Sequence, residues 1–103
     1  MRKPADLAGN SLYNGRMYYV YTLLLANSAR YVGRSDNLKR RIGEHKAGKV
    51  QSTKGRNPEL IYYEGYYSKE DAIARELFLK TGDGRQQLKK QLQHTLMARS
   101  SSG

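Results

Sequence analysis

The stretch YVYTLLLANSARYVG, residues 19–33, decides the fold. The aromatic and β-branched composition of residues 17–25 favours a strand. A short polar loop, residues 26–29, leads to a second strand at residues 30–34, so the stretch predicts a β-hairpin. Because side chains alternate along a strand, we expect Tyr21 to lie beside Tyr31 of the second strand. Gly33 has no side chain and leaves room for another group at the strand end.

A basic helix is predicted directly after the hairpin. Ser35 or Asp36 is the expected N-cap, because short polar side chains can accept hydrogen bonds from the first helical amides. Leu38 and Ile42 are four residues apart and form the expected core-facing stripe. Gly48 is the expected glycine at the C-terminal end of the helix.

The remainder of the chain predicts one strand and two helices. Residues 48–58 read as a basic loop that carries hydroxyl groups, and residues 59–64 as a strand. A capping-box pattern at Ser68 predicts a helix over residues 68–80, with a stripe formed by Ile73, Leu77 and Lys80.

Glycines at residues 82–84 are expected to break that helix, and leucines at spacing four predict a last helix over residues 85–97. The predicted fold is α/β (α+β): a three-stranded antiparallel sheet flanked by helices, in the order β-β-α-β-α-α. We expect a flexible N-terminal arm at residues 1–16, one domain at residues 17–98 and a disordered tail at residues 99–103.

Charge points to a polyanionic partner. The 103 residues include 19 Lys or Arg against 9 Asp or Glu, a net charge of +10, which favours binding to nucleic acid or an anionic membrane surface. Residues 30–56 alone carry nine basic and two acidic side chains, interleaved with tyrosine, and this favours a surface that follows phosphates. The apolar run at residues 17–26 is too short to span a bilayer, so no membrane partner is expected.

The chain contains no cysteine, which excludes disulfides, thiolate metal sites and a catalytic cysteine. The same absence favours a reducing, cytoplasmic location.

Four motifs in order, YVY at residues 19–21, YVG at 31–33, NLKRRIGEH at 37–45 and ARELFLK at 74–80, resemble the GIY-YIG endonuclease superfamily. They are most similar to its small stand-alone members, which resemble the N-terminal nuclease module of the excision-repair incision enzyme. The resemblance covers about residues 17–85. It implies a GIY-YIG-like fold and a metal-dependent endonuclease that hydrolyses phosphodiester bonds in DNA.

The resemblance also implies a set of catalytic residues at Tyr21, Tyr31, Arg34, Arg41, His45 and Glu76. Glu76 would hold one Mg²⁺ or Mn²⁺ ion, Arg41 would stabilise charge on the phosphate, and Tyr31 would contact it. Tyr21 and His45 would orient and deprotonate the attacking water. A phenol with a pKa of about 10 is a poor base at neutral pH and an imidazole near about 6.5 a better one, so His45 is preferred and Tyr21 stays an alternative.

The expected phosphate-contacting residues are Arg34, Lys39, Arg40, Lys46, Lys49, Ser52, Thr53, Lys54 and Arg56. Single-stranded or branched DNA is the favoured substrate, because no dedicated element for reading the major groove is evident. Two alternatives stay open: a nucleic-acid-binding module that does not cut, and a nuclease directed by a partner protein.

Two features depart from the family pattern. Tyr19 stands where the family has glycine, and no asparagine follows residue 57, although many members have one after the helix that carries the metal-binding glutamate. A purely structural role for Glu76, as an ion pair with Lys80 one turn away, is the simplest competing interpretation.

Overall fold

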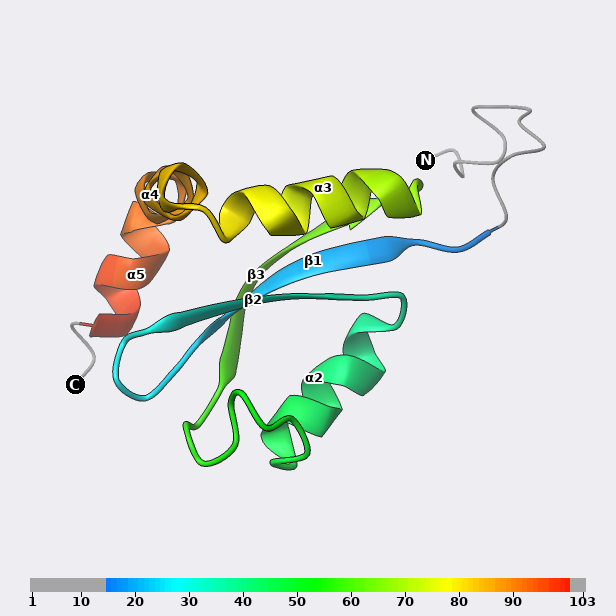
Figure 1. Ribbon diagram of the computed structural model, residues 1–103. Helices are drawn as coiled ribbons and strands as arrows, with labels where there is room; N and C mark the ends of the chain where they lie inside the picture. Colours follow the sequence, from blue (N-terminus) through cyan, green and yellow to red (C-terminus); the bar gives the residue numbers. More distant parts are fainter. Residues whose placement is uncertain (1–14, 101–103) are drawn as a thin grey trace.

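The computed structural model describes residues 15–100 and shows a three-stranded antiparallel sheet with helices on both faces (Figure 1). The elements in chain order are β1 (Tyr18–Leu24), β2 (Arg30–Ser35), α2 (Leu38–Lys46), β3 (Glu59–Tyr66), α3 (Lys69–Leu79), α4 (Gly82–Gln91) and α5 (Gln93–Ser100). The strand order is β2-β1-β3, so the hairpin places β1 in the middle and leaves β2 at an edge. The predicted fold class is confirmed.

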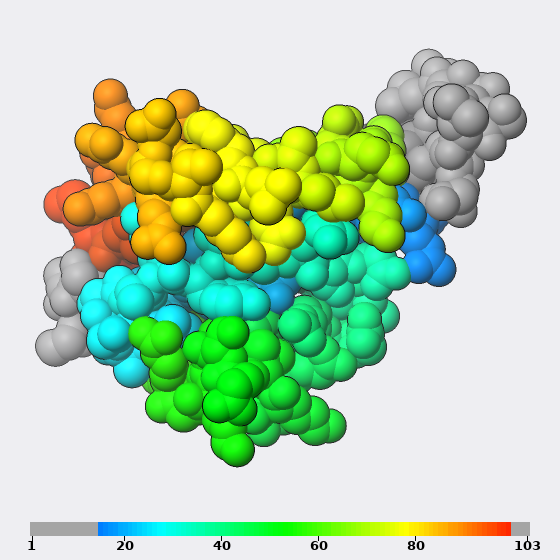
Figure 2. Space-filling model, viewed as in Figure 1, coloured from blue at the N-terminus to red at the C-terminus, as the bar shows by residue number. Residues whose placement is uncertain are grey.

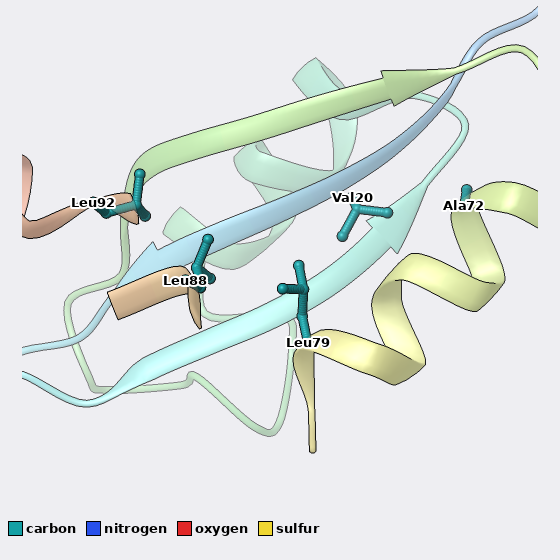
Figure 3. Packing of buried hydrophobic residues seen from close by; sticks show 5 residues of the cluster. All are labelled: Val20, Ala72, Leu79, Leu88 and Leu92. Carbon is teal, nitrogen blue, oxygen red and sulfur yellow. The ribbon is translucent and has the colours of Figure 1, made fainter. Parts of the chain in front are cut away.

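Alternation along β1 divides the interior into two cores. Val20 points to one face and packs with Ala72 and Leu79 of α3, Leu88 of α4 and Leu92 at the end of α4 (Figure 3). Tyr21, Leu23 and Leu25 point to the other face, where Leu38 and Ile42 of α2 pack against them. The helix α2 therefore lies on the face opposite to α3 and α4, as Figure 1 shows.

The expected N-cap of α2 is wrong by one or two residues. Strand β2 continues through Ser35, and the Asp36 carboxylate instead pairs with Arg16 and Arg40. Asn37 caps the helix, and its side chain accepts a hydrogen bond of 3.0 Å from the backbone amide of Arg40.

The predicted end of α2 is confirmed. The amide of Gly48 donates to the carbonyl of His45 at 3.1 Å, and the amide of Lys49 donates to that of Glu44 at 3.0 Å. Gly48 has a φ of 74°, and these paired bonds form a Schellman motif, for which glycine is the favoured residue.

The predicted stripe of α3 is partly wrong. Ser68 caps the helix as expected, by accepting from the amide of Asp71. Leu77, however, is 60% exposed, whereas Ala72 and Leu79 are buried. The direction in which α3 lies across the sheet sets which of its faces is covered, and spacing along the helix does not specify that direction.

The segment of residues 82–84, expected only to break α3, forms the first turn of the next helix, α4. Thr81 caps α4 by accepting from the amide of Gly84 at 3.0 Å. A Cβ atom at Gly84 would lie 1.9 Å from the carbonyl oxygen of Phe78. Glycine at this position therefore permits the first turn of α4 to pack against the last turn of α3.

The predicted last helix is two helices in the structure. Leu92 separates α4 from α5, which turns sharply away (Figure 1). This break keeps Leu88 and Leu92 buried and Leu96 packed against the same core. Arg99, at the far end of α5, pairs with Glu59 of β3.

Helix α5 continues through Ser100, two residues into the expected tail. The expected arm lies outside the described residues, except for Gly15 and Arg16. Within residues 15–100, no helix has both the length and the apolar character needed to cross a membrane.

Candidate active site

Tyr21 reaches the edge of the sheet across Gly33. Tyr21 lies on the central strand directly opposite Gly33 of β2. A Cβ atom at Gly33 would lie 2.4 Å from the Tyr21 hydroxyl oxygen and 2.5 Å from Cζ. The phenol therefore occupies the space that a side chain at Gly33 would need, and it is directed over the edge strand.

This arrangement corrects one expectation and supports another. The space at Gly33 admits the Tyr21 ring itself and is not left open for an approaching group. Tyr31 pairs with Leu23 along the strands, yet its ring lies 6.4 Å from that of Tyr21, centroid to centroid. Tyr31 thus lies beside Tyr21, as the alternation of side chains predicted.

His45 connects the Tyr21 phenol to the interior. His45 is 1% exposed, and its Nε2 lies 2.8 Å from the Tyr21 hydroxyl oxygen. Its Nδ1 lies 2.7 Å from Oγ1 of Thr53, and its ring lies 5.2 Å from that of Tyr31. Both imidazole nitrogens are therefore engaged, one by a predicted site residue and one by a loop hydroxyl.

The predicted phosphate contact at Thr53 is wrong. Thr53 is 0% exposed, because the segment of residues 48–58 folds back beneath α2 and buries both Thr53 and Val50. Thr53 orients His45 instead. A hydroxyl eight residues after a helical histidine has no distinctive sequence signal, so sequence reasoning had no means of assigning this role.

Burial keeps both Tyr21 and His45 neutral. Burial raises the pKa of the Tyr21 phenol, and the nearby Arg41 only partly offsets this rise. Burial lowers the pKa of His45, and the charge of Arg41 lowers it further. At neutral pH, Tyr21 is accordingly a phenol and His45 an uncharged imidazole, so the bond between them joins two neutral groups.

Glu76 reaches the same edge of the sheet from α3, on the opposite face. Its carboxylate charge acts on the Tyr21 phenol and contributes to the raised pKa. Oε1 of Glu76 accepts from Nε of Arg34 at 3.2 Å, and Oε2 accepts from Nζ of Lys80 at 3.1 Å. The pair with Lys80 expected from helix spacing is present, together with a second cation from β2.

Arg41 of α2 lies close to Tyr21. Its guanidinium donates to Glu44 at 3.0 Å and is close enough to Tyr21 to lower the pKa of the phenol. Because β2 is an edge strand, groups from both helical layers meet along it. Figure 2 shows this edge in cyan, between α3 and α4 (yellow and orange) above and the green segment of residues 48–58 below.

The donor set fits a hard divalent cation only in part. Among residues 15–100, no group of three or more His, Cys, Asp or Glu side chains is placed to hold a metal ion. Mg²⁺ is commonly held by one or two carboxylates, with water and substrate phosphate as the other ligands. Glu76, with a side chain 16% exposed, can supply such a carboxylate once Arg34 and Lys80 move off its oxygens.

The chain matches the GIY-YIG catalytic domain over residues 17–90. It belongs to the GIY-YIG family. The two tyrosine motifs, Arg41 and Glu76 all lie within the matched span. Nucleases of this family typically use a divalent metal ion, which agrees with the partial fit at Glu76.

Similar proteins carry the name UPF0213. A UPF0213 protein of Limosilactobacillus reuteri is 38% identical over 81 residues, covering 75% of this chain and 84% of that protein. A UPF0213 protein of Natronomonas pharaonis is 41% identical over 66 residues, covering 62% of this chain and 78% of that protein. The solution NMR structure of a UPF0213 protein from Bacillus halodurans is 31% identical, with a TM-score of 0.48, and covers 72% of this chain and 83% of that one.

The predicted phosphate-contacting residues of this GIY-YIG domain do not form one surface around Tyr21. Lys39 and Lys46 line a separate groove of about 650 Å³ with Tyr19 and Tyr63, and none of the six predicted catalytic residues lines it. The side chains at Lys49, Ser52 and Lys54 are exposed. Arg40 pairs with Asp36 and Glu44, and Arg56 bonds to Ser52 and Asn27.

Proposed function

We propose that this GIY-YIG protein is a metal-dependent DNA endonuclease that hydrolyses phosphodiester bonds, with a preference for single-stranded or branched DNA. The observation that carries the proposal is the hydrogen-bonded chain from Tyr21 through His45 to Thr53, which ends at the sheet edge beside Arg41 and Glu76.

The chain of hydrogen bonds provides a path for the proton of the attacking water. With a proton on Nδ1 of His45 donated to Thr53, Nε2 accepts the hydroxyl proton of Tyr21. The Tyr21 oxygen can then take a proton from water as it passes its own to Nε2. Imidazole is a better base than phenol at neutral pH, which makes His45 the final acceptor, and Tyr21, whose hydroxyl lies between His45 and the sheet edge, is the group nearest the attacking water.

The other residues act on the phosphate. The guanidinium of Arg41 stabilises the negative charge that grows on the phosphate oxygens, because its planar donors match two of them. Tyr31 contacts the phosphate from β2. Glu76 would hold one Mg²⁺ or Mn²⁺ ion, which when bound polarises the phosphate and stabilises the departing oxygen. Phosphate oxygens would draw Arg34 and Lys80 away from the carboxylate.

The cellular setting belongs to the same proposal. The absence of cysteine favours a cytoplasmic location. The likeness of the motifs to the nuclease module of the excision-repair incision enzyme supports the same cleavage chemistry. A partner protein that directs the nuclease is compatible with the small size of the domain.

Cleavage of matched single-stranded, duplex and branched oligonucleotides, with Mg²⁺, Mn²⁺ or EDTA, tests the proposal. We expect cleavage with either metal and none with EDTA. Glu76→Gln should reduce cleavage by about 100-fold or more while DNA binding is kept. Glu70→Gln, on the exposed first turn of α3, is the matched control and should cut normally. Equal cleavage by wild type and Glu76→Gln would refute the metal assignment.

One observation favours a second candidate function. Both oxygens of Glu76 are already paired with cations, as they would be in a nucleic-acid-binding module that does not cut. In that case the wild-type protein would bind DNA in the same assay and leave every substrate intact with both metals.

A further inference from the structure

A cationic pocket lies along β2, next to the candidate active site. It has a volume of about 420 Å³ and lies between the start of β2 and the junction of α3 with α4. Its polar lining includes the basic residues Arg30, Lys80 and Arg85, and none of the lining residues is acidic. Tyr31, one of the predicted catalytic residues, forms part of its wall. In Figure 2, the start of β2 (cyan) faces α4 (orange) across this region.

Arg30 is the residue that the fold alone does not explain. Its Nη2 donates to the backbone carbonyl of Arg85 at 3.3 Å, whereas its Nη1 is buried and has no hydrogen-bond partner among the described residues. Burial lowers the pKa of the Arg30 guanidinium, and the charge of Arg85 lowers it further. Burying a charged donor without an acceptor destabilises a protein, so a neutral side chain would suit the fold better here.

The positive charge of this pocket is not compensated within the described chain. Over residues 15–100, neither Arg30 nor Arg85 forms an ion pair. Lys80 pairs with Glu76, on the side of the active site. A phosphate group would supply both the negative charge and the acceptor oxygens that the two guanidinium groups lack.

We propose that the pocket formed by Arg30 and Arg85 binds a phosphate group of the nucleic-acid substrate, on the strand beside the bond that is cleaved. The choice of nucleic acid as the source of this phosphate rests on the proposed function. The pocket holds the substrate strand along β2, so that a neighbouring phosphate lies over Tyr31, Tyr21 and Glu76. Positioning of this kind binds the strand without reading its sequence.

Binding of a short fluorescent single-stranded oligonucleotide in EDTA tests the pocket without any cleavage. The test variants are Arg85→Gln and Arg30→Met. Lys90 is exposed near the end of α4, so Lys90→Gln is the control that removes one positive charge outside the pocket. We expect Kd to rise about tenfold for Arg85→Gln and Arg30→Met and less than about twofold for Lys90→Gln. The slope of log K against log salt concentration should fall by about 0.7 for the loss of one phosphate contact to a single strand.

Thermal unfolding with inorganic pyrophosphate gives an independent measurement. Pyrophosphate should raise the Tm of wild type and of Lys90→Gln, and leave that of Arg85→Gln unchanged. Without the anion, Arg30→Met should unfold at the same temperature as wild type or higher, because it removes an unpaired buried charge. That result would show that its weaker DNA binding does not come from misfolding.

Oligonucleotides with and without a 5′-terminal phosphate separate the two sources of the phosphate. Equal affinity identifies a backbone phosphate, as proposed. A dependence of binding on the terminal phosphate that Arg85→Gln abolishes would keep the phosphate pocket and overturn the backbone assignment.

The pocket and the nuclease can fail separately. Equal weakening of DNA binding by Arg85→Gln and Lys90→Gln, with equal stabilisation by pyrophosphate, would overturn the pocket even if wild type cuts DNA. Conversely, a wild type that cuts nothing, yet loses its pyrophosphate response on Arg85→Gln, would uphold the anion site and refute the nuclease.

Discussion

Replacing Gly33 with alanine tests whether this glycine is the opening through which Tyr21 reaches the sheet edge. The new methyl group would lie 2.4 Å from the Tyr21 hydroxyl oxygen. Carbon and oxygen atoms that are not bonded normally approach to roughly 3.5 Å, so the ring or the strand must move by about 1 Å. Tyr21 is 1% exposed and is held on its other side by His45 at 2.8 Å, which leaves the ring little space.

Two effects follow from a displacement of this size. Overpacking of a well-packed core costs about 1–3 kcal/mol. For a domain of this size, each kcal/mol lowers Tm by about 4–8 °C, so Gly33→Ala should lower it by roughly 5–20 °C. If Tyr21 contacts the attacking water, a shift of about 1 Å should also lower kcat by about 100-fold.

Gly43→Ala is the matched control for this substitution. A Cβ atom at Gly43, on the exposed side of α2, would have no other atom within 4 Å. Alanine in the interior of a helix is favoured over glycine by about 0.5–1 kcal/mol, so Gly43→Ala should raise Tm slightly and leave cleavage intact. Differential scanning calorimetry and a nicking assay measure both variants.

A double mutant isolates the contact. In a Tyr21→Leu background, the unfolding free energy lost on Gly33→Ala should be smaller by about 1 kcal/mol or more, because the clashing hydroxyl and ring are gone. If Gly33→Ala instead behaves like Gly43→Ala, with an unchanged or higher Tm, the role assigned to Gly33 is refuted.

Three further predictions concern the buried polar groups. Thr53→Val leaves Nδ1 of His45 without a partner and should lower the unfolding free energy by about 1–3 kcal/mol and the cleavage rate by at least about tenfold. Thr53→Ser keeps the hydroxyl and should restore both. A urea titration measures the stability of each variant, and the nicking assay measures its cleavage. Burial lowers the pKa of His45, so the unfolded chain binds more protons than the folded chain below about pH 6.5, and stability should fall on acidification. The Tm of His45→Gln should therefore change less than that of wild type between about pH 5 and pH 7. An equal dependence of Tm on pH in the two proteins would contradict this. Glu64 accepts two hydrogen bonds from Arg75, at 2.9 Å and 3.0 Å, and Glu64→Gln should cost about 2–3 kcal/mol in a denaturant titration, more than the exposed Glu70→Gln. Burial alone would raise the pKa of Glu64, but the bonds from Arg75 and the two tyrosines outweigh it, so this stabilisation is present above about pH 4.5 and is lost as the pH falls through the lower pKa of the folded state.

The sequence by itself predicted most of the elements and named the candidate site residues. Alternation from Tyr18 to Leu24 and the polar turn after it specify the hairpin, since strand periodicity and turn chemistry are local properties. The four-residue spacing of Arg41 and His45 placed them on one face of α2, and Gly48 marked the end of that helix, whereas the N-cap at Asn37 was not predicted. Resemblance of the ordered motifs then predicted Glu76, which no local pattern could have distinguished from other helical glutamates.

Only the tertiary structure decided which groups are in contact. The register of β1 against β2 sets Gly33 beneath the Tyr21 ring, and a shift of one residue would have turned that ring away. The fold of the loop after α2 buried Thr53 against His45, although its sequence is typical of an exposed basic loop.

Helix orientation was also a tertiary outcome. Leu77 is exposed and Leu79 buried because the direction in which α3 crosses the sheet, set by its packing on Val20 and Val32, decides which face is covered. The same packing brings Glu76 over the β2 edge to meet Arg34. Contacts between residues distant in sequence depend on how whole elements pack, and a local pattern carries no information about that packing.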